Sequence, residues 1–171
     1  ASCDDNKNQR AIIKAFAQSE LFRENAKLKI VGQGPLLREL KALAKELNIS
    51  ERVSFLGYLT RSQIYDELRL SNAFVLASKY ETFGVVLIEA LVAGIPVVST
   101  KCGGPECIVD DTNGLLVNND CNKSLLKGME YLYENACLYD PIKLRRSCIE
   151  NFGKDAVVGK LLEVYSRAIK S

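Results

Sequence analysis

Histidine and tryptophan are absent from this chain of 171 residues. Without histidine it lacks the commonest general base and the commonest metal ligand, so Ser/His and Cys/His nucleophile pairs are excluded. No apolar run approaches the roughly 20 residues of a membrane-spanning helix, and the polar residues 1–10 do not resemble a signal peptide. We therefore expect a cytoplasmic protein whose chemistry depends on groups other than imidazole.

Neither sign of charge dominates, because 23 basic residues face 21 acidic ones and the net charge is +2. This balance gives no electrostatic basis for binding nucleic acid or an anionic membrane. The cysteines form no Cys-x-x-Cys pair, so the pattern favours scattered reduced thiols over a zinc site or a thioredoxin-like motif. They are Cys3, Cys102, Cys107, Cys121, Cys137 and Cys148.

Short apolar segments alternate with segments of helical period along the whole chain. We expect strands at residues 28–31, 53–56, 73–77, 97–99 and 114–117, and helices at residues 8–19, 36–47, 62–70, 84–93, 122–134, 141–150 and 153–169. This order predicts one α/β domain over residues 1–171, a Rossmann-like doubly wound parallel sheet flanked by helices. No strand precedes the first helix, so we expect the first strand of this domain to be missing from the chain.

Two carboxylates, Glu81 and Glu89, bracket an apolar run that follows a predicted strand. A helix beginning at Gly84 would place Glu81 before its start and Glu89 in its second turn, with free N–H groups between them that can hold an anion. Carboxylates do not bind phosphate, so the two glutamates would serve hydroxyl groups of the same ligand. A nucleotide, a sugar phosphate or both would fit, whereas the alternative is two surface carboxylates beside a helix start.

Glycine-rich turns follow three other predicted strands, and all of these loops should converge on one rim of the sheet. The Gly32-x-Gly34 turn lacks the third glycine of a dinucleotide fingerprint, and the next strand ends at Gly57 without an acidic residue, which disfavours a nicotinamide cofactor. No Walker loop is present. Each glycine turn, including Gly103-Gly104 before Glu106, fits either close approach of a ligand or a plain tight turn.

In order and spacing, these segments together resemble the C-terminal half of a retaining glycosyltransferase of family 4, a GT-B enzyme with two Rossmann-like domains. The matching segments are residues 28–36, 52–57, 78–90, 94–98, 103–106 and 113–117. The resemblance extends over nearly the whole chain. In that family the C-terminal domain binds a nucleotide-diphosphate sugar, and the Glu-x7-Glu motif belongs to the site for this donor.

The resemblance implies roles for individual residues. Glu81 and Lys7 would be the catalytic pair, with Glu81 on hydroxyls of the donor sugar and Lys7 on the diphosphate, and Glu89 would hold the ribose hydroxyls. The family's arginine, five residues before the lysine, is replaced here by Ser2. The further donor-binding residues implied are Thr82, Phe83, Gly84, Val85, Val86, Gly32, Gly34, Gly57, Tyr58, Gly103, Gly104 and Glu106.

The resemblance also implies what the chain works with. GT-B enzymes generally need no metal or other cofactor, and the donor substrate is a nucleotide-diphosphate sugar. A saccharide or lipid-linked acceptor, and any peripheral membrane association, would depend on an N-terminal domain outside this chain, so the isolated domain should not transfer sugar. Two alternatives stay open: a nucleotide-sugar epimerase or isomerase, which the lack of histidine disfavours, and a non-catalytic binding module, which Ser2 favours.

Overall fold

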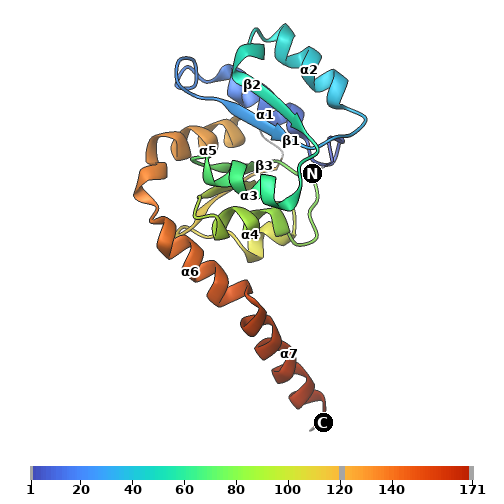
Figure 1. Ribbon diagram of the computed structural model, residues 1–171, viewed down its shortest axis with the longest axis vertical. Coiled ribbons are helices and arrows are strands. Elements are labelled where there is room, and N and C mark those ends of the chain that lie inside the picture. Colours follow the sequence, from blue (N-terminus) through green and yellow to red (C-terminus); the bar gives the residue numbers. More distant parts are fainter. Residues whose placement is uncertain (1, 120–121, 170–171) are drawn as a thin grey trace.

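The strands form two parallel sheets in the computed structural model, which describes residues 2–119 and 122–169 (Figure 1). Ala1 and Cys121 lie outside the described residues. One sheet pairs β1 (Leu28–Val31) with β2 (Val53–Gly57). The other has the order β3 (Phe74–Leu76), β4 (Val97–Thr100) and β5 (Gly114–Val117), in register from Phe74 opposite Val97 and Val97 opposite Gly114. The α/β class with parallel strands is thereby confirmed.

The helices lie where the sequence predicts them, with ends that differ by one or two residues. They are α1 (Gln9–Gln18), α2 (Leu37–Glu46), α3 (Arg61–Arg69), α4 (Val85–Val92), α5 (Asn122–Asn135), α6 (Pro141–Phe152) and α7 (Lys154–Ile169), with short 3-10 helices at Ser50–Arg52, Gly104–Cys107 and Ala136–Leu138. At the end of α4, Gly94 has φ 85°, and Ile95 N–H donates to Ala90 O. This is the glycine-based C-cap that the sequence predicts.

One continuous sheet is expected, whereas within the described residues β1 pairs only with β2, and β3 pairs only with β4. The N-terminal segment spans this interruption. Ser2 forms a parallel bridge with Gln33 just after β1, and Asn6 O accepts a hydrogen bond from Lys79 N–H after β3. The described chain contains no strand that pairs with the facing edges of β1 and β3.

Both sheets nevertheless share one core, because residues of each belong to one buried cluster together with residues of α1 and α5. Ile30 and Val53 from the first sheet belong to the same buried cluster as Ala77 and Val98 around the second. A second cluster fills the space under α4 and α6, with Leu87 fully buried. This packing fixes the ends of β1, β3 and β4 relative to one another, and the loops of the candidate site follow those ends.

The last helix, α7, extends away from the rest of the molecule (Figure 1). Among its described residues none is buried, and its main packing contact is with α6. Large apolar side chains are exposed along it: Val157, Val158, Leu161, Leu162, Val164, Tyr165 and Ile169. Across the described residues, no helix has the length and apolar character needed to pass through a bilayer.

Candidate functional site

The loops that follow the strands meet at one edge of the molecule and are joined by hydrogen bonds. Residues 2–8 contact residues 33–36 through Cys3, whose N–H donates to Gln33 O at 2.9 Å and whose carbonyl accepts from Leu36 N–H at 3.1 Å. The segment after β3 bonds in turn to the N-terminal segment, to the turn after β4, and to Asn119, whose side-chain amide donates to Lys79 O at 2.8 Å. The predicted convergence of these loops is therefore present.

Lys7 and Glu81 form an ion pair at the centre of this edge. The distance from Lys7 Nζ to Glu81 Oε2 is 2.5 Å, and the two side chains are 22% and 15% exposed. The two residues are 74 positions apart in the sequence, so the contact is purely tertiary. A cation and a carboxylate in one partly desolvated place can serve an anionic and a hydroxylated part of one ligand.

The loop that carries Lys7 is shaped by its own side chains. Asp4 Oδ1 accepts a hydrogen bond from Lys7 N–H at 2.9 Å, and this bond is the largest cause that lowers the pKa of Asp4. Asn8 adopts the left-handed conformation, φ 49° and ψ 38°, immediately before α1. Asparagine tolerates this conformation better than most residues, and the chain can therefore turn sharply into the helix after Lys7.

The main chain of Glu81 is held by the turn after β4. Glu81 N–H donates to Cys102 O at 2.9 Å, and Gly104 N–H donates to Glu81 O at 2.7 Å. A Cβ on Gly103 would lie 2.8 Å from Glu81 O, and one on Gly104 would lie 2.3 Å from Phe83 Cα. Both glycines are therefore required for the approach of two loops, a role that the sequence pattern does not separate from approach of a ligand.

Glu106 closes the same turn from its other side. Its carboxylate accepts hydrogen bonds from Cys102 N–H at 3.2 Å and from Gly103 N–H at 3.0 Å. Glu106 is an exposed residue, but its Oε2 atom already accepts hydrogen bonds from both amides. Glu106 thus stabilises the turn against which Glu81 is bonded.

Helix α4 begins directly after Gly84, which has φ 97° and ψ 43° and caps the helix without a side-chain hydrogen bond. Within the described part of the chain, Val85 N–H and Val86 N–H have no hydrogen-bond acceptor. Glu89 lies one turn further along α4, exposed and without a polar partner among the described residues. The structure therefore gives the predicted free helix start between the two glutamates, but it does not bring Glu89 into contact with Glu81.

The remaining predicted residues lie around this centre. Thr82 and Phe83 are exposed, and the Phe83 ring meets the Phe152 ring edge to face at 6.1 Å. Gly32 N–H donates to Gly57 O at 2.8 Å, which joins the ends of β1 and β2, and Tyr58 beside them is 76% exposed.

Gly34 is a third glycine that a neighbouring loop requires. A Cβ there would lie 2.5 Å from Cys3 O, so the Gly32-x-Gly34 turn allows the N-terminal segment to approach. This is a further reason for the glycine, besides the tight turn and the approach of a ligand that the sequence suggests.

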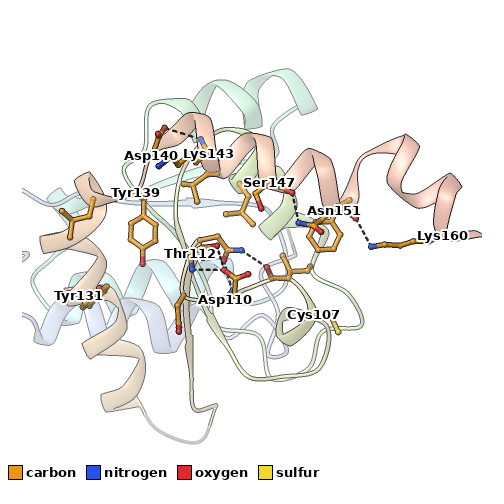
Figure 2. A pocket seen from close by; sticks show the side chains of 18 residues that line it. Cys107, Asp110, Thr112, Tyr131, Tyr139, Asp140, Lys143, Ser147, Asn151 and Lys160 are labelled. Carbon is orange, nitrogen blue, oxygen red and sulfur yellow. Dashed lines mark hydrogen bonds between the residues drawn. The ribbon is translucent and has the colours of Figure 1, made fainter.

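A cavity lies elsewhere, between α6 and the turn before β5 (Figure 2). Its volume is about 640 Å³, and none of the predicted site residues lines it. Its polar groups largely satisfy one another: Asp110 Oδ1 accepts from Thr112 N–H at 2.9 Å, and Asp140 caps α6. Residues 2–119 and 122–169 also contain no group of three or more Cys, Asp or Glu side chains placed to hold a metal ion.

Comparison with known proteins decides the family. The sequence pattern of the family described as "Glycosyl transferases group 1" matches residues 1–155. The chain belongs to this family.

Among curated relatives, this family member is similar to the N-acetylgalactosamine-N,N'-diacetylbacillosaminyl-diphospho-undecaprenol 4-alpha-N-acetylgalactosaminyltransferase of Campylobacter jejuni, with 38% identity over 134 residues, 77% of this chain and 35% of that protein. It is also similar to the N-acetyl-alpha-D-glucosaminyl L-malate synthase of Bacillus anthracis, with 33% identity over 170 residues, 93% of this chain and 42% of that protein. The chain thus spans less than half the length of these relatives.

Solved structures show the same fold. The lipopolysaccharide outer core galactosyltransferase WaaB, in its apo form, superposes with a TM-score of 0.87 at 21% identity, over 98% of this chain and 48% of that one. HepE of Anabaena in complex with UDP superposes with a TM-score of 0.85 at 23% identity, over 98% and 47%. The Rossmann-like GT-B half predicted from the sequence is therefore confirmed as the fold of this family member.

Proposed function

We propose that this chain is the donor-binding part of a glycosyltransferase that takes a nucleotide-diphosphate sugar. The observation that carries the proposal is the ion pair of Lys7 with Glu81 beside the open start of α4. Glu81 and the start of α4 follow β3, at the edge where α/β sheets bind their ligands, and the segment that carries Lys7 is bonded to the loop after β3. The structure of HepE in complex with UDP supports a nucleoside diphosphate as part of the ligand.

Lys7 and the amides of Val85 and Val86 would hold the diphosphate. When the bond from the sugar to the nucleotide diphosphate breaks, negative charge grows on the leaving phosphate and positive charge on the sugar ring. A lysine ammonium and free helix N–H groups are suited to the first charge. Because Ser2 replaces the arginine of the family pattern, Lys7 would be the main side-chain cation at this place. We also propose that no metal ion takes part.

The two glutamates would hold hydroxyl groups. Glu81 is bonded to Lys7, so arrival of the diphosphate would give the ammonium a second acceptor and leave Glu81 oxygens for the sugar hydroxyls. Glu89, which is exposed one turn along α4, would hold the ribose hydroxyls. The glycine turns, Tyr58 and Glu106 would complete the donor site around them. We assign Glu81 to positioning in a front-face, retaining transfer, and not to nucleophilic attack.

A second domain would supply the acceptor. The relatives are more than twice as long as this chain, and the exposed apolar side chains of α7 offer a surface to pack against such a domain. We further propose that a strand preceding Ser2 fills the interruption between β1 and β3, and that the whole enzyme works in the cytoplasm on a saccharide or lipid-linked acceptor.

Titration of the chain with UDP, GDP and ADP, followed by amide resonances in NMR spectra, tests donor binding. We expect one nucleotide to shift the amides of Val85, Val86 and Lys7, and to do so without added metal and in the presence of EDTA. Lys7→Ala and Glu81→Ala should weaken binding of that nucleotide and of its sugar conjugate, respectively. Silence with all three nucleotides would refute the proposal. Binding without turnover by the complete protein would instead indicate a non-catalytic module.

A further inference from the structure

Asn6 makes three hydrogen bonds to the loop that follows β3. Its main-chain carbonyl accepts from Lys79 N–H at 2.8 Å, its Oδ1 accepts from Tyr80 N–H at 3.1 Å, and its Nδ2 donates to Tyr80 O at 3.0 Å. The side-chain amide of Asn6 thus pairs with both the N–H and the carbonyl of the Tyr80 main chain, in the way that a neighbouring strand would.

This pairing sets the register of the two loops. Asn6 directly precedes Lys7, and Tyr80 directly precedes Glu81, so the contact between the first residues of each pair places the second residues opposite each other. The resulting distance from Lys7 Nζ to Glu81 Oε2 is 2.5 Å. The side chain of Lys79 adds an ion pair with Asp5 at 2.5 Å, but both of these groups are largely exposed.

Lys7 needs such a constraint because of its own flexibility. A lysine side chain has several rotatable bonds and loses about 2 kcal/mol of rotamer freedom when it is held in one place. Asp4 fixes the main chain of Lys7 only within its own loop, through the bond to Lys7 N–H. Asn6 is the residue through which that loop is bonded to the main chain of the Glu81 loop.

We infer that Asn6 is a positioning residue, which holds Lys7 and Glu81 in the register that the donor diphosphate and sugar require. The inference rests on the proposed function of Lys7. The main chain before Lys7 is already bound to the Glu81 loop before any ligand arrives, so this part of the site is preorganised. An asparagine has the right groups for the contact, since it presents one acceptor and one donor side by side.

The first test observes the ion pair without any nucleotide. The Lys7 ammonium, held by Glu81, should give a slowly exchanging ¹⁵Nζ signal in NMR spectra, which Lys7→Met assigns by removing it. We expect Asn6→Ala to abolish this signal while the protein stays folded by circular dichroism. The matched control is Asn25→Ala, an exposed asparagine without a partner among the described residues, which should retain it. Absence of the signal in the unmodified protein, or its persistence in Asn6→Ala, would overturn the inference.

The second test compares a nucleoside diphosphate with its monophosphate. With UDP and UMP, or the guanosine or adenosine pair if that is the one bound, Lys7→Met should weaken the diphosphate about tenfold and the monophosphate less than twofold. Asn6→Ala should weaken binding of the diphosphate three- to tenfold. Asn6→Gln, which keeps the amide, should recover part of this affinity. If Lys7→Met leaves the preference for diphosphate intact, the proposed role of Lys7 fails. If Lys7→Met removes it and Asn6→Ala does not, only the role of Asn6 fails. If Asn6→Ala does not fold, Asn6→Ser, which lacks the paired amide donor and acceptor, takes its place in both tests.

Discussion

Gly104→Ala should displace the loop that carries Glu81, because the space for a methyl group is already occupied by main chain. A Cβ there would lie 2.3 Å from Phe83 Cα and 2.4 Å from Phe83 N and O, whereas ordinary contact begins near 3.4 Å. The two loops must therefore separate by about 1 Å, and neither can yield by a rotation of a side chain. Overpacking of this kind costs about 1–3 kcal/mol, and contact with main chain points to the upper end.

Urea unfolding measures this cost. With a slope of roughly 1–3 kcal/mol per molar urea for a small domain, a loss of about 3 kcal/mol lowers the midpoint by about 1 M or more. Since separation of the loops also breaks the 2.7 Å bond from Gly104 N–H to Glu81 O, binding of the nucleotide sugar should weaken at least tenfold. The matched control is Gly159→Ala on α7, where a Cβ meets nothing within 4 Å. It should leave binding unchanged and stabilise α7 by about 0.5–1 kcal/mol. An unchanged midpoint and unchanged binding in Gly104→Ala would refute the reasoning.

Three further predictions concern the polar groups of the site. Lys7→Met and Glu81→Gln can be combined in a double-mutant cycle of urea unfolding. The coupling free energy should be about 1 kcal/mol and should fall as salt is added. Additive effects of the two substitutions would show that the ion pair is not formed. Glu106→Gln should lower the unfolding free energy by about 1 kcal/mol and shift the amide resonance of Gly103, because one charged acceptor is lost; an unmoved resonance would contradict the bond. The lowered pKa of Asp4 implies stability that is complete above the pKa of about 3.9 in the unfolded chain and is lost as pH falls through the pKa of the folded protein. Asp4→Asn should therefore be less stable than the unmodified protein at pH 7, and this difference should shrink in thermal unfolding at pH 2; an unchanged difference would exclude the carboxylate as its source.

The predicted free helix start between the two glutamates illustrates what local sequence can reveal. Gly84 and Gly94 bound α4 through left-handed conformations that glycine adopts without steric cost. The helical segment Val85–Val92 between them can be recognised from a short stretch of sequence. Glu81 could therefore be placed before the helix without knowledge of any distant contact. By the same logic the sequence placed every strand within a residue of its position.

Asn6 and Asp4 were not identified from the sequence, because nothing local distinguishes them. An exposed asparagine in a polar loop is ordinary, and Asn6 acquires its role from Lys79 and Tyr80, which lie more than 70 positions away. Asn8 is the one residue of this segment whose type fits its local conformation, since asparagine tolerates the left-handed conformation before α1. The sequence pattern marks the glycines of both turns, but whether they allow a ligand or a neighbouring loop to approach depends on what lies opposite them.

The sequence by itself determined the alternation of strands and helices, the bounds of α4 and the family, because these depend on short-range hydrogen bonding, on periodic burial and on motifs in a fixed order. Tertiary structure alone decided that Lys7 meets Glu81, that Asn6 sets their register, and that Gly104 lies under Phe83. Those facts depend on how the shared core orients β1, β3 and β4, and contacts between the loops beyond them are fixed only once that core is packed.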